Sequence, residues 1–265
     1  MLPKFKLVKW AAGTAITGGS SLALLVYYIT SDIQYVPVSA NDPIFRSKHF
    51  QEYNPNGNPT VHDLHIARVP LKQIRPQLLE DPNKLLERYC GGIWAGAGKP
   101  RGIIASSSSD FSAPLLPLLL QYMVSLTLDP CHTSGFAPQR LLHTWFDRGE
   151  SSRAQLWSTF ELFQSDYEVG TDIVGNFEVV DRSNESLLIR AGDKTSNKGL
   201  RPLDALIEVA FHIDQESKVA VFKFKSLFFQ GAGTTSNLPM QGPMVWLHEL
   251  YAKILLKSGV WHVLR

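Results

Sequence analysis

Two long alternating strands followed by a helix occupy the C-terminal third of this chain, and they constrain its fold more than any other feature. Apolar residues recur at every second position from Leu203 to Phe229, and with helical spacing from Pro243 to Leu264. The period of two indicates strands with one buried face, and the polar turn from Asp214 to Ser217 predicts an antiparallel hairpin. A twisted antiparallel sheet that grips a terminal helix leaves a hollow between the two, which suits an apolar ligand.

Shorter segments before this region predict the rest of the sheet. Alternation predicts a first strand at Val61 to Val69 and two further strands at Gly175 to Val180 and Ser186 to Ala191. Pro70 to Arg88 carries leucines and an isoleucine at helical spacing, so it predicts a short helical region. The expected fold class is therefore α+β.

The glycine-rich segment from Gly91 to Arg101 raises the question of a phosphate-binding loop. A P-loop needs a glycine, four residues, and then Gly-Lys followed by Ser or Thr. Here Ile93 stands at the first glycine position and Pro100 follows the lysine. The segment therefore predicts a flexible loop or a strand-edge turn, with no phosphate chemistry.

An apolar segment from Leu7 to Ile29 carries a single charge, Lys9, and no acidic residue lies before it or within it. As a helix it would span about 34 Å, which is enough to cross a bilayer. We expect residues 1–31 to form a retained transmembrane anchor and residues 32–58 to form a linker. A cleaved signal peptide, a mitochondrial import segment and a hydrophobic tail packed on its own domain are the alternatives.

Lysines precede this segment, which favours an N-terminus in the cytosol and a main domain on the opposite side of the membrane. No arginine occurs before Arg46, which favours the endoplasmic reticulum or another endomembrane over the mitochondrion. In that orientation Asn184-Glu-Ser is a usable glycosylation acceptor, whereas Pro59 blocks the acceptor at Asn58.

Composition and spacing exclude several classes of function. The net charge is +2, and no run of lysine and arginine could follow a nucleic-acid backbone, so no nucleic-acid partner is expected. Cys90 and Cys131 are too few for a disulfide scaffold, although their pairing stays open. His62 and His65 face opposite sides of a strand, and His248 lacks a second histidine four residues on, so no metal or cofactor is expected.

The order of these segments resembles a known superfamily. The matching segments are Gly175-Asn-Phe-Glu-Val-Val, Ser186-Leu-Leu-Ile-Arg-Ala-Gly-Asp193, the paired strands through Phe229, and Trp246-Leu-His-Glu-Leu-Tyr251-Ala-Lys-Ile-Leu255. Together they resemble an uncharacterised branch of the START-like, helix-grip superfamily, which includes lipid carriers, polyketide cyclases and plain binding proteins. The resemblance implies an antiparallel sheet wrapped around the C-terminal helix over residues 59–265, with a helical insertion at about 104–165. It carries over no catalytic residue.

The expected hollow defines the candidate site residues. Those expected to line it, with plain core packing as the alternative, are Ile207, Phe211, Phe224, Trp246 and Tyr251. The helix residues expected to point inward are Leu247, Leu250, Tyr251, Ile254 and Trp261. Glu208 and His212 could donate or accept a proton only if they faced the hollow, and a solvated outer face is the expectation for both.

Three functions are compatible with this fold, and whether the protein is an enzyme stays open. The first is a membrane-tethered START-like protein that binds a hydrophobic small molecule, such as a lipid or a polyketide-like metabolite. The second is a cofactor-independent cyclase or isomerase, which a buried acid or base in a closed pocket would favour. The third is a structural or assembly protein whose hollow is filled by its own side chains.

Overall fold

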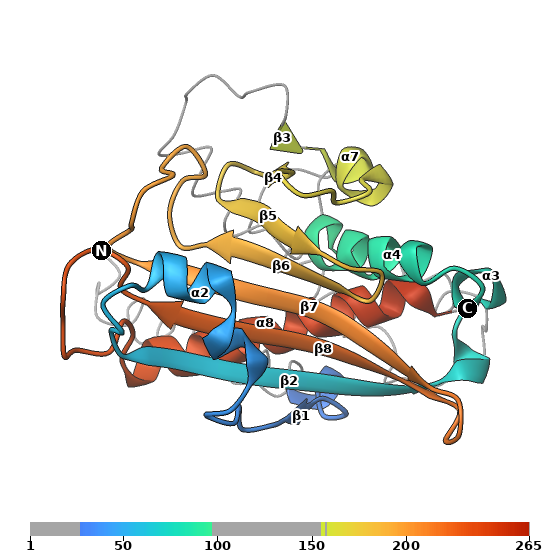
Figure 1. The fold of residues 1–265 in the computed structure, drawn as a ribbon. Coiled ribbons are helices and arrows are strands. Elements are labelled where there is room, and N and C mark those ends of the chain that lie inside the picture. Colours follow the sequence, from blue (N-terminus) through green and yellow to red (C-terminus); the bar gives the residue numbers. More distant parts are fainter. Residues whose placement is uncertain (1–26, 97–154, 157, 265) are drawn as a thin grey trace, which may run out of the picture.

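The computed structural model describes residues 27–96, 155–156 and 158–264, which form one sheet with helices on both faces (Figure 1). The strands are β1 (Gln34–Tyr35), β2 (Thr60–Pro70), β3 (Gln155–Leu156), β4 (Asp172–Ile173), β5 (Phe177–Arg182), β6 (Ser186–Ala191), β7 (Asp204–Asp214) and β8 (Val219–Phe229). The helices are η1 (Pro43–Arg46), α2 (Lys48–Tyr53), η2 (Leu71–Gln73), α3 (Pro76–Leu79), α4 (Pro82–Ala95), α7 (Thr159–Gln164) and α8 (Gly242–Val263).

The strands lie in the order β1-β2-β8-β7-β6-β5-β4-β3, and all neighbours are antiparallel except β3 and β4. The first long strand, β2, thus pairs with the last, β8, from Thr60 opposite Phe229 to Pro70 opposite Val219. The α+β class, the antiparallel sheet and the C-terminal helix that the sequence predicts are confirmed.

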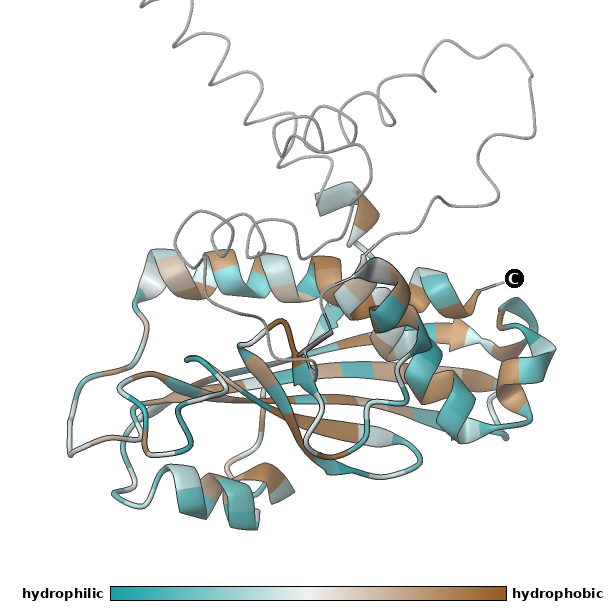
Figure 2. Cartoon of the chain, turned by 90° about the horizontal axis from the view of Figure 1, so that it is seen from above, coloured by the Kyte–Doolittle hydropathy of each residue, from teal (hydrophilic) through white to brown (hydrophobic). Residues whose placement is uncertain are grey.

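Helices cover the two faces of the sheet differently. Seen from above, α4 and α8 lie along one face, which we call the inner face, and α2 lies against the opposite, outer face (Figure 2). Alternation along β8 places Phe222 and Phe224 on the inner face and Leu227 and Phe229 on the outer face. The ring of Tyr89 in α4 packs edge-on against Phe222, with 4.9 Å between ring centroids. The main core therefore lies between the sheet and the two long helices.

Helix α4 continues through Gly91 and Gly92, where the sequence predicts a loop, and it ends at Gly96 with φ of 85°. A Cβ on Gly92 would lie 2.8 Å from Cα of Gly259 in α8. A Cβ on Gly259 would in turn lie 2.5 Å from Cε2 of Tyr89. Glycine is needed here because the two helices cross at very short range, and this tertiary contact overrides the weak helix propensity of glycine.

The buried side of α8 differs from the side that the sequence predicts. Leu247, expected to point inward, is 54% exposed, while Ala252, Leu256 and Gly259 are buried. The reason is that α8 is apolar on nearly all sides, so its residue pattern defines no single buried stripe. The position of Gly259 sets which side of α8 is buried, because α4 crosses α8 at this residue.

The range 32–58, expected to be a linker, contains short elements that cover the outer face. Asp42 and Ser47 cap η1 and α2 by accepting hydrogen bonds from the backbone N–H groups of Ile44 and Phe50. The side chains that form this second core are Ile44, Phe45, Phe50, Tyr53, Val180, Leu188, Leu206, Leu227 and Phe229.

Several sequence predictions concern residues outside the described ranges. These are most of the predicted transmembrane segment, most of the helical insertion at about 104–165, and Cys131. Cys90 has a free thiol buried in α4, and burial raises the pKa of that thiol. Asn184 is exposed in the turn between β5 and β6, while Asn58 is 3% exposed.

Replacing Gly259 with alanine should destabilise the fold by about 1–3 kcal/mol, because the added methyl group overlaps the ring of Tyr89. The matched control is Gly242→Ala in the first turn of the same helix, where an added Cβ meets no atom within 4 Å. Urea denaturation measures both free energies of unfolding. Equal stability of the two variants would show that the helices do not cross at this distance.

Candidate functional site

Four of the five predicted lining residues belong to the main core between the sheet and the helices α4 and α8. Ile207, Phe211 and Phe224 are buried on the inner face, with exposed fractions of 6%, 3% and 1%. Tyr251 of α8 packs against the same core, and burial raises the pKa of its hydroxyl. Trp246 is not brought to them: it is 61% exposed on the first half of α8.

A polar cluster interrupts this apolar layer. The register of β2 and β8 places Asp63 directly opposite Ser226, and His65 follows Asp63 on the same face of β2. His248 reaches the carboxylate of Asp63 from α8. These four residues, which we call the Asp63 cluster, therefore come from two strands and the C-terminal helix.

The cluster is almost closed to solvent. The exposed fractions are 3% for Asp63 and 0% for both His65 and Ser226, while the side chain of His248 is 17% exposed. Nε2 of His65 lies 3.0 Å from Oδ2 of Asp63, a hydrogen bond. Nε2 of His248 lies 3.3 Å from the same oxygen, close enough for an ion pair but not aligned as a hydrogen bond.

Charge and hydrogen bonding determine the protonation of the cluster. Burial alone would raise the pKa of Asp63, but the two imidazoles outweigh burial and hold this pKa well below its usual value. Because an ionised carboxylate only accepts hydrogen bonds, Nε2 of His65 carries a proton and donates it to Oδ2 of Asp63.

Three members of the cluster retain a polar atom without a partner. Among the described residues, no hydrogen-bond partner exists for Oδ1 of Asp63, Nδ1 of His65 or Oγ of Ser226. Leaving such an atom buried without a partner costs about 1–3 kcal/mol, so three such atoms close together oppose folding substantially. Phe228 packs edge-on against His248 at 4.6 Å, and Tyr35 against His65 at 5.8 Å.

Sequence reasoning missed this cluster because its members are far apart in the chain. The histidines were judged as metal-ligand pairs, and by that criterion His65 and His248 stood alone. A usable signal was present at Ser226, which is polar at a position of β8 where the alternation calls for an apolar side chain. Polar residues at inward positions on paired strands indicate a site.

Glu208 and His212 lie on the outer face, away from α8. Oε2 of Glu208 is 2.6 Å from Nζ of Lys225, and Asp42 lies 2.9 Å from the same nitrogen. Burial would lower the pKa of Lys225, but these two carboxylates raise it. Nδ1 of His212 is 3.9 Å from Glu185, and both side chains are exposed. Neither candidate can reach the space between sheet and helix.

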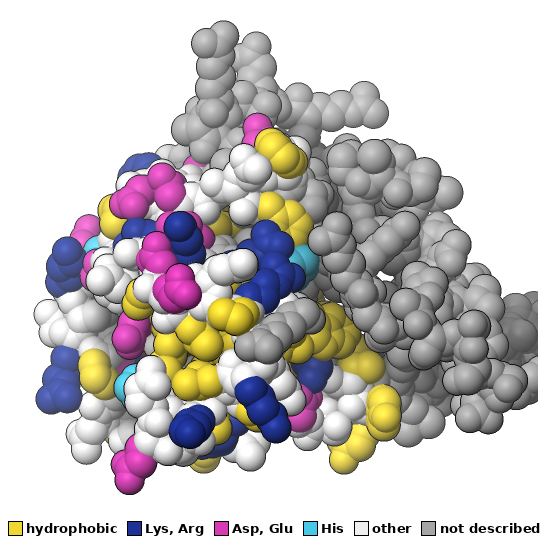
Figure 3. Space-filling view, turned by 90° about the vertical axis from the view of Figure 1, so that its right-hand side faces the viewer, with side chains coloured by type: hydrophobic (Ala, Val, Ile, Leu, Met, Phe, Trp, Pro, Cys, Tyr) yellow, Lys and Arg dark blue, Asp and Glu magenta, His cyan; other side chains and the backbone are white. Residues whose placement is uncertain are grey.

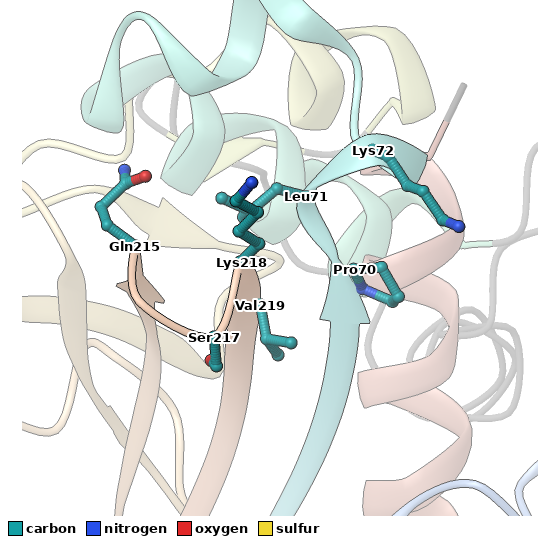
Figure 4. Close-up of a pocket in the computed structure, with 7 residues that line it drawn as sticks. All are labelled: Pro70, Leu71, Lys72, Gln215, Ser217, Lys218 and Val219. Carbon is teal, nitrogen blue, oxygen red and sulfur yellow. The ribbon is translucent and has the colours of Figure 1, made fainter.

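Among the described residues two shallow hollows stand out, and neither lies between the inner face and α8. One lies at the end of the sheet, where the side chains drawn in Figure 4 come from the β2–η2 junction and the β7–β8 hairpin. Its lining residues are Pro70, Leu71, Lys72, Gln215, Ser217, Lys218 and Val219. Figure 3 views this end of the molecule, where hydrophobic side chains gather among lysines and arginines. The other hollow lies beside α7.

Comparison with protein families, curated proteins and solved structures finds no match for this chain. In the described part of the chain, no group of three or more His, Cys, Asp and Glu side chains is arranged to hold a metal ion. Within residues 27–96, 155–156 and 158–264, no helix has both the length and the apolar character needed to cross a bilayer.

Replacing Asp63 with asparagine should lower stability at neutral pH by about 3 kcal/mol and flatten its acid dependence. The lowered pKa means that ionised Asp63 stabilises the fold above its unfolded pKa of about 4, and that this contribution is lost as pH falls below that value. Chemical denaturation between about pH 2 and pH 7 measures the difference. The control is Glu216→Gln in the exposed β7–β8 turn, and a profile for Asp63→Asn that parallels the control would contradict this account.

Proposed function

We propose that this chain is a membrane-tethered protein of the START-like, helix-grip type that binds a hydrophobic small molecule between its sheet and α8. The chain order supports the proposal: one long strand, then helices, then a run of antiparallel strands and a final helix. The pairing of β2 with β8 also supports it, because it makes one continuous surface for α8 to cover.

The observation that carries the proposal is the inner face itself. It is an apolar surface of phenylalanine, isoleucine and valine side chains, and its polar groups are gathered in the Asp63 cluster. Small-molecule sites combine an apolar wall with a few convergent polar groups in this way. The apolar wall holds the body of the ligand, and the cluster fixes its orientation.

An apolar molecule should therefore remain with the protein through purification in detergent and be detected by mass spectrometry of an organic extract. The variant Ala252→Leu should lose this molecule, because Ala252 is buried on the side of α8 that packs on the core. The control is Lys253→Leu at the next position, which is half-buried. If no apolar molecule accompanies the wild-type protein, and Ala252→Leu only lowers stability, the hollow is filled by the protein's own side chains.

A second candidate, a cofactor-independent cyclase or isomerase, is favoured by the hydrogen bond between His65 and Asp63. A carboxylate that orients an imidazole is a common arrangement for proton transfer, and Nδ1 of His65 has no partner among the described residues. Incubating the co-purified molecule with the protein in heavy water separates the two functions. A carrier returns the molecule unchanged, whereas a proton-transfer enzyme introduces deuterium at a carbon atom.

The membrane tether is proposed from the sequence and from the start of the described chain. Tyr27 and Tyr28 are 74% and 75% exposed, as expected for side chains at a membrane interface. Asp32 pairs with Lys257 at 2.6 Å, which holds this segment against α8. We propose that the domain faces the lumen of the endoplasmic reticulum or of another endomembrane.

Replacing Leu24 and Leu25 with arginine should release the protein from membranes, because two charges in the apolar run from Leu22 to Ile29 make insertion unfavourable by several kcal/mol. The measurement is the partition between pellet and supernatant after alkaline extraction. Retention of this variant in the pellet would refute the anchor. In the same cells Asn184→Gln should remove a glycan, and a wild-type protein without a glycan would place the domain on the cytosolic side.

A further inference from the structure

The Asp63 cluster offers a specific set of hydrogen-bonding atoms. Oδ1 of Asp63 is an acceptor, and the hydroxyl of Ser226 can both donate and accept. Asp63 and Ser226 are cross-strand neighbours on the inner face, where opposed Cβ atoms lie about 5 Å apart. One small polar group could therefore contact both side chains at once.

Hydrogen bonding defines the group that the cluster can take. Asp63 is ionised, since its pKa lies well below its usual value, and its Oδ1 can only accept a hydrogen bond. The hydroxyl of Ser226 opposite it can donate one. The complementary group donates one hydrogen bond and accepts another.

We propose that the Asp63 cluster recognises the hydroxyl group of an apolar ligand, that is, an alcohol, a phenol or an enol. The ligand hydroxyl donates to Oδ1 of Asp63 and accepts from the hydroxyl of Ser226. This inference rests on the proposed binding of a hydrophobic molecule and names the chemical group by which that molecule is held.

Neighbouring side chains define where the apolar body of the ligand lies. Ile207 of β7 lies opposite Ser226 of β8, and Phe224 of β8 lies opposite His65 of β2. Both side chains are buried on the inner face. The hydroxyl therefore marks one end of the ligand, and the remainder follows the apolar side chains of β7 and β8 beneath α8.

The first turns of α8 provide the entrance. Met244, Trp246 and Leu247 are each more than half exposed, whereas His248 is largely buried and contacts Asp63. A helix end with few buried contacts can move at low cost, whereas the later turns are held by the crossing with α4. Displacement of residues 242–248 would uncover the cluster and leave the core intact.

The test measures binding of four ligands with the same ten-carbon chain by isothermal titration calorimetry on the full-length protein in detergent. The ligands are decanol, methyl decyl ether, decanoate and decylamine. Decanol should bind at least about tenfold more tightly than the ether, because the ether cannot donate to Asp63. Decanoate should bind more weakly than decanol, because an ionised carboxylate cannot donate a hydrogen bond to Asp63.

Three variants locate the effect. Ser226→Ala should lower the affinity for decanol about tenfold and leave the affinity for the ether unchanged. His212→Gln, an exposed histidine on the outer face, is the control and should change neither affinity. Asp63→Asn should also reduce the preference for decanol, and Ser226→Ala decides the matter if Asp63→Asn does not fold.

The outcomes separate this inference from the proposed function. Equal binding of decanol and the ether would overturn hydroxyl recognition and leave apolar binding standing, with the cluster satisfied by water alone. Tighter binding of decylamine or decanoate would overturn the inference in favour of a charged ligand. Failure of all four ligands to bind, together with no co-purified molecule, would overturn the proposed function and this inference with it.

Discussion

The pairing of β2 with β8 is the constraint on which the rest of the structure depends. It joins strands that are separated by most of the chain, and such long-range closure costs entropy that only extensive pairing and burial can offset. The pairing sets Asp63 opposite Ser226, and it fixes β8 so that α8 returns across the inner face. His248 then meets Asp63 at 3.3 Å. Without this register, β2 and β8 would not form one continuous surface for α8 to cover, and the Asp63 cluster would not assemble.

Much of the sheet could be predicted from the sequence, because one buried and one exposed face impose a period of two. β6, β7 and β8 begin and end within a residue or two of the predicted bounds, and α8 does so as well. The buried side of α8 could not be predicted, since a helix that is apolar all round carries no directional pattern. Gly91 and Gly92 were misread as a loop, because glycine at a close helix crossing has the same local signature as glycine in a turn.

The candidate site was predictable only in its apolar part. Ile207, Phe211 and Phe224 follow from alternation alone, whereas the Asp63 cluster depends on which strands pair and where α8 docks. Buried polar atoms without partners oppose folding, so a cluster of them in an otherwise apolar core departs from what stability favours. Departures of this kind are expected at functional sites, which is why the cluster, and not Glu208 or His212, is the centre of our account.

The central claim is that the carboxylate of Asp63 orients the imidazole of His65 inside the core. Nitrogen-15 NMR of the histidine rings at neutral pH tests this most directly, because protonated and unprotonated ring nitrogens have well-separated chemical shifts. The account predicts that Nε2 of His65 carries a proton, which it donates to Asp63. A His65 ring with its proton on Nδ1 alone would show that it does not donate to Asp63, and would contradict the account.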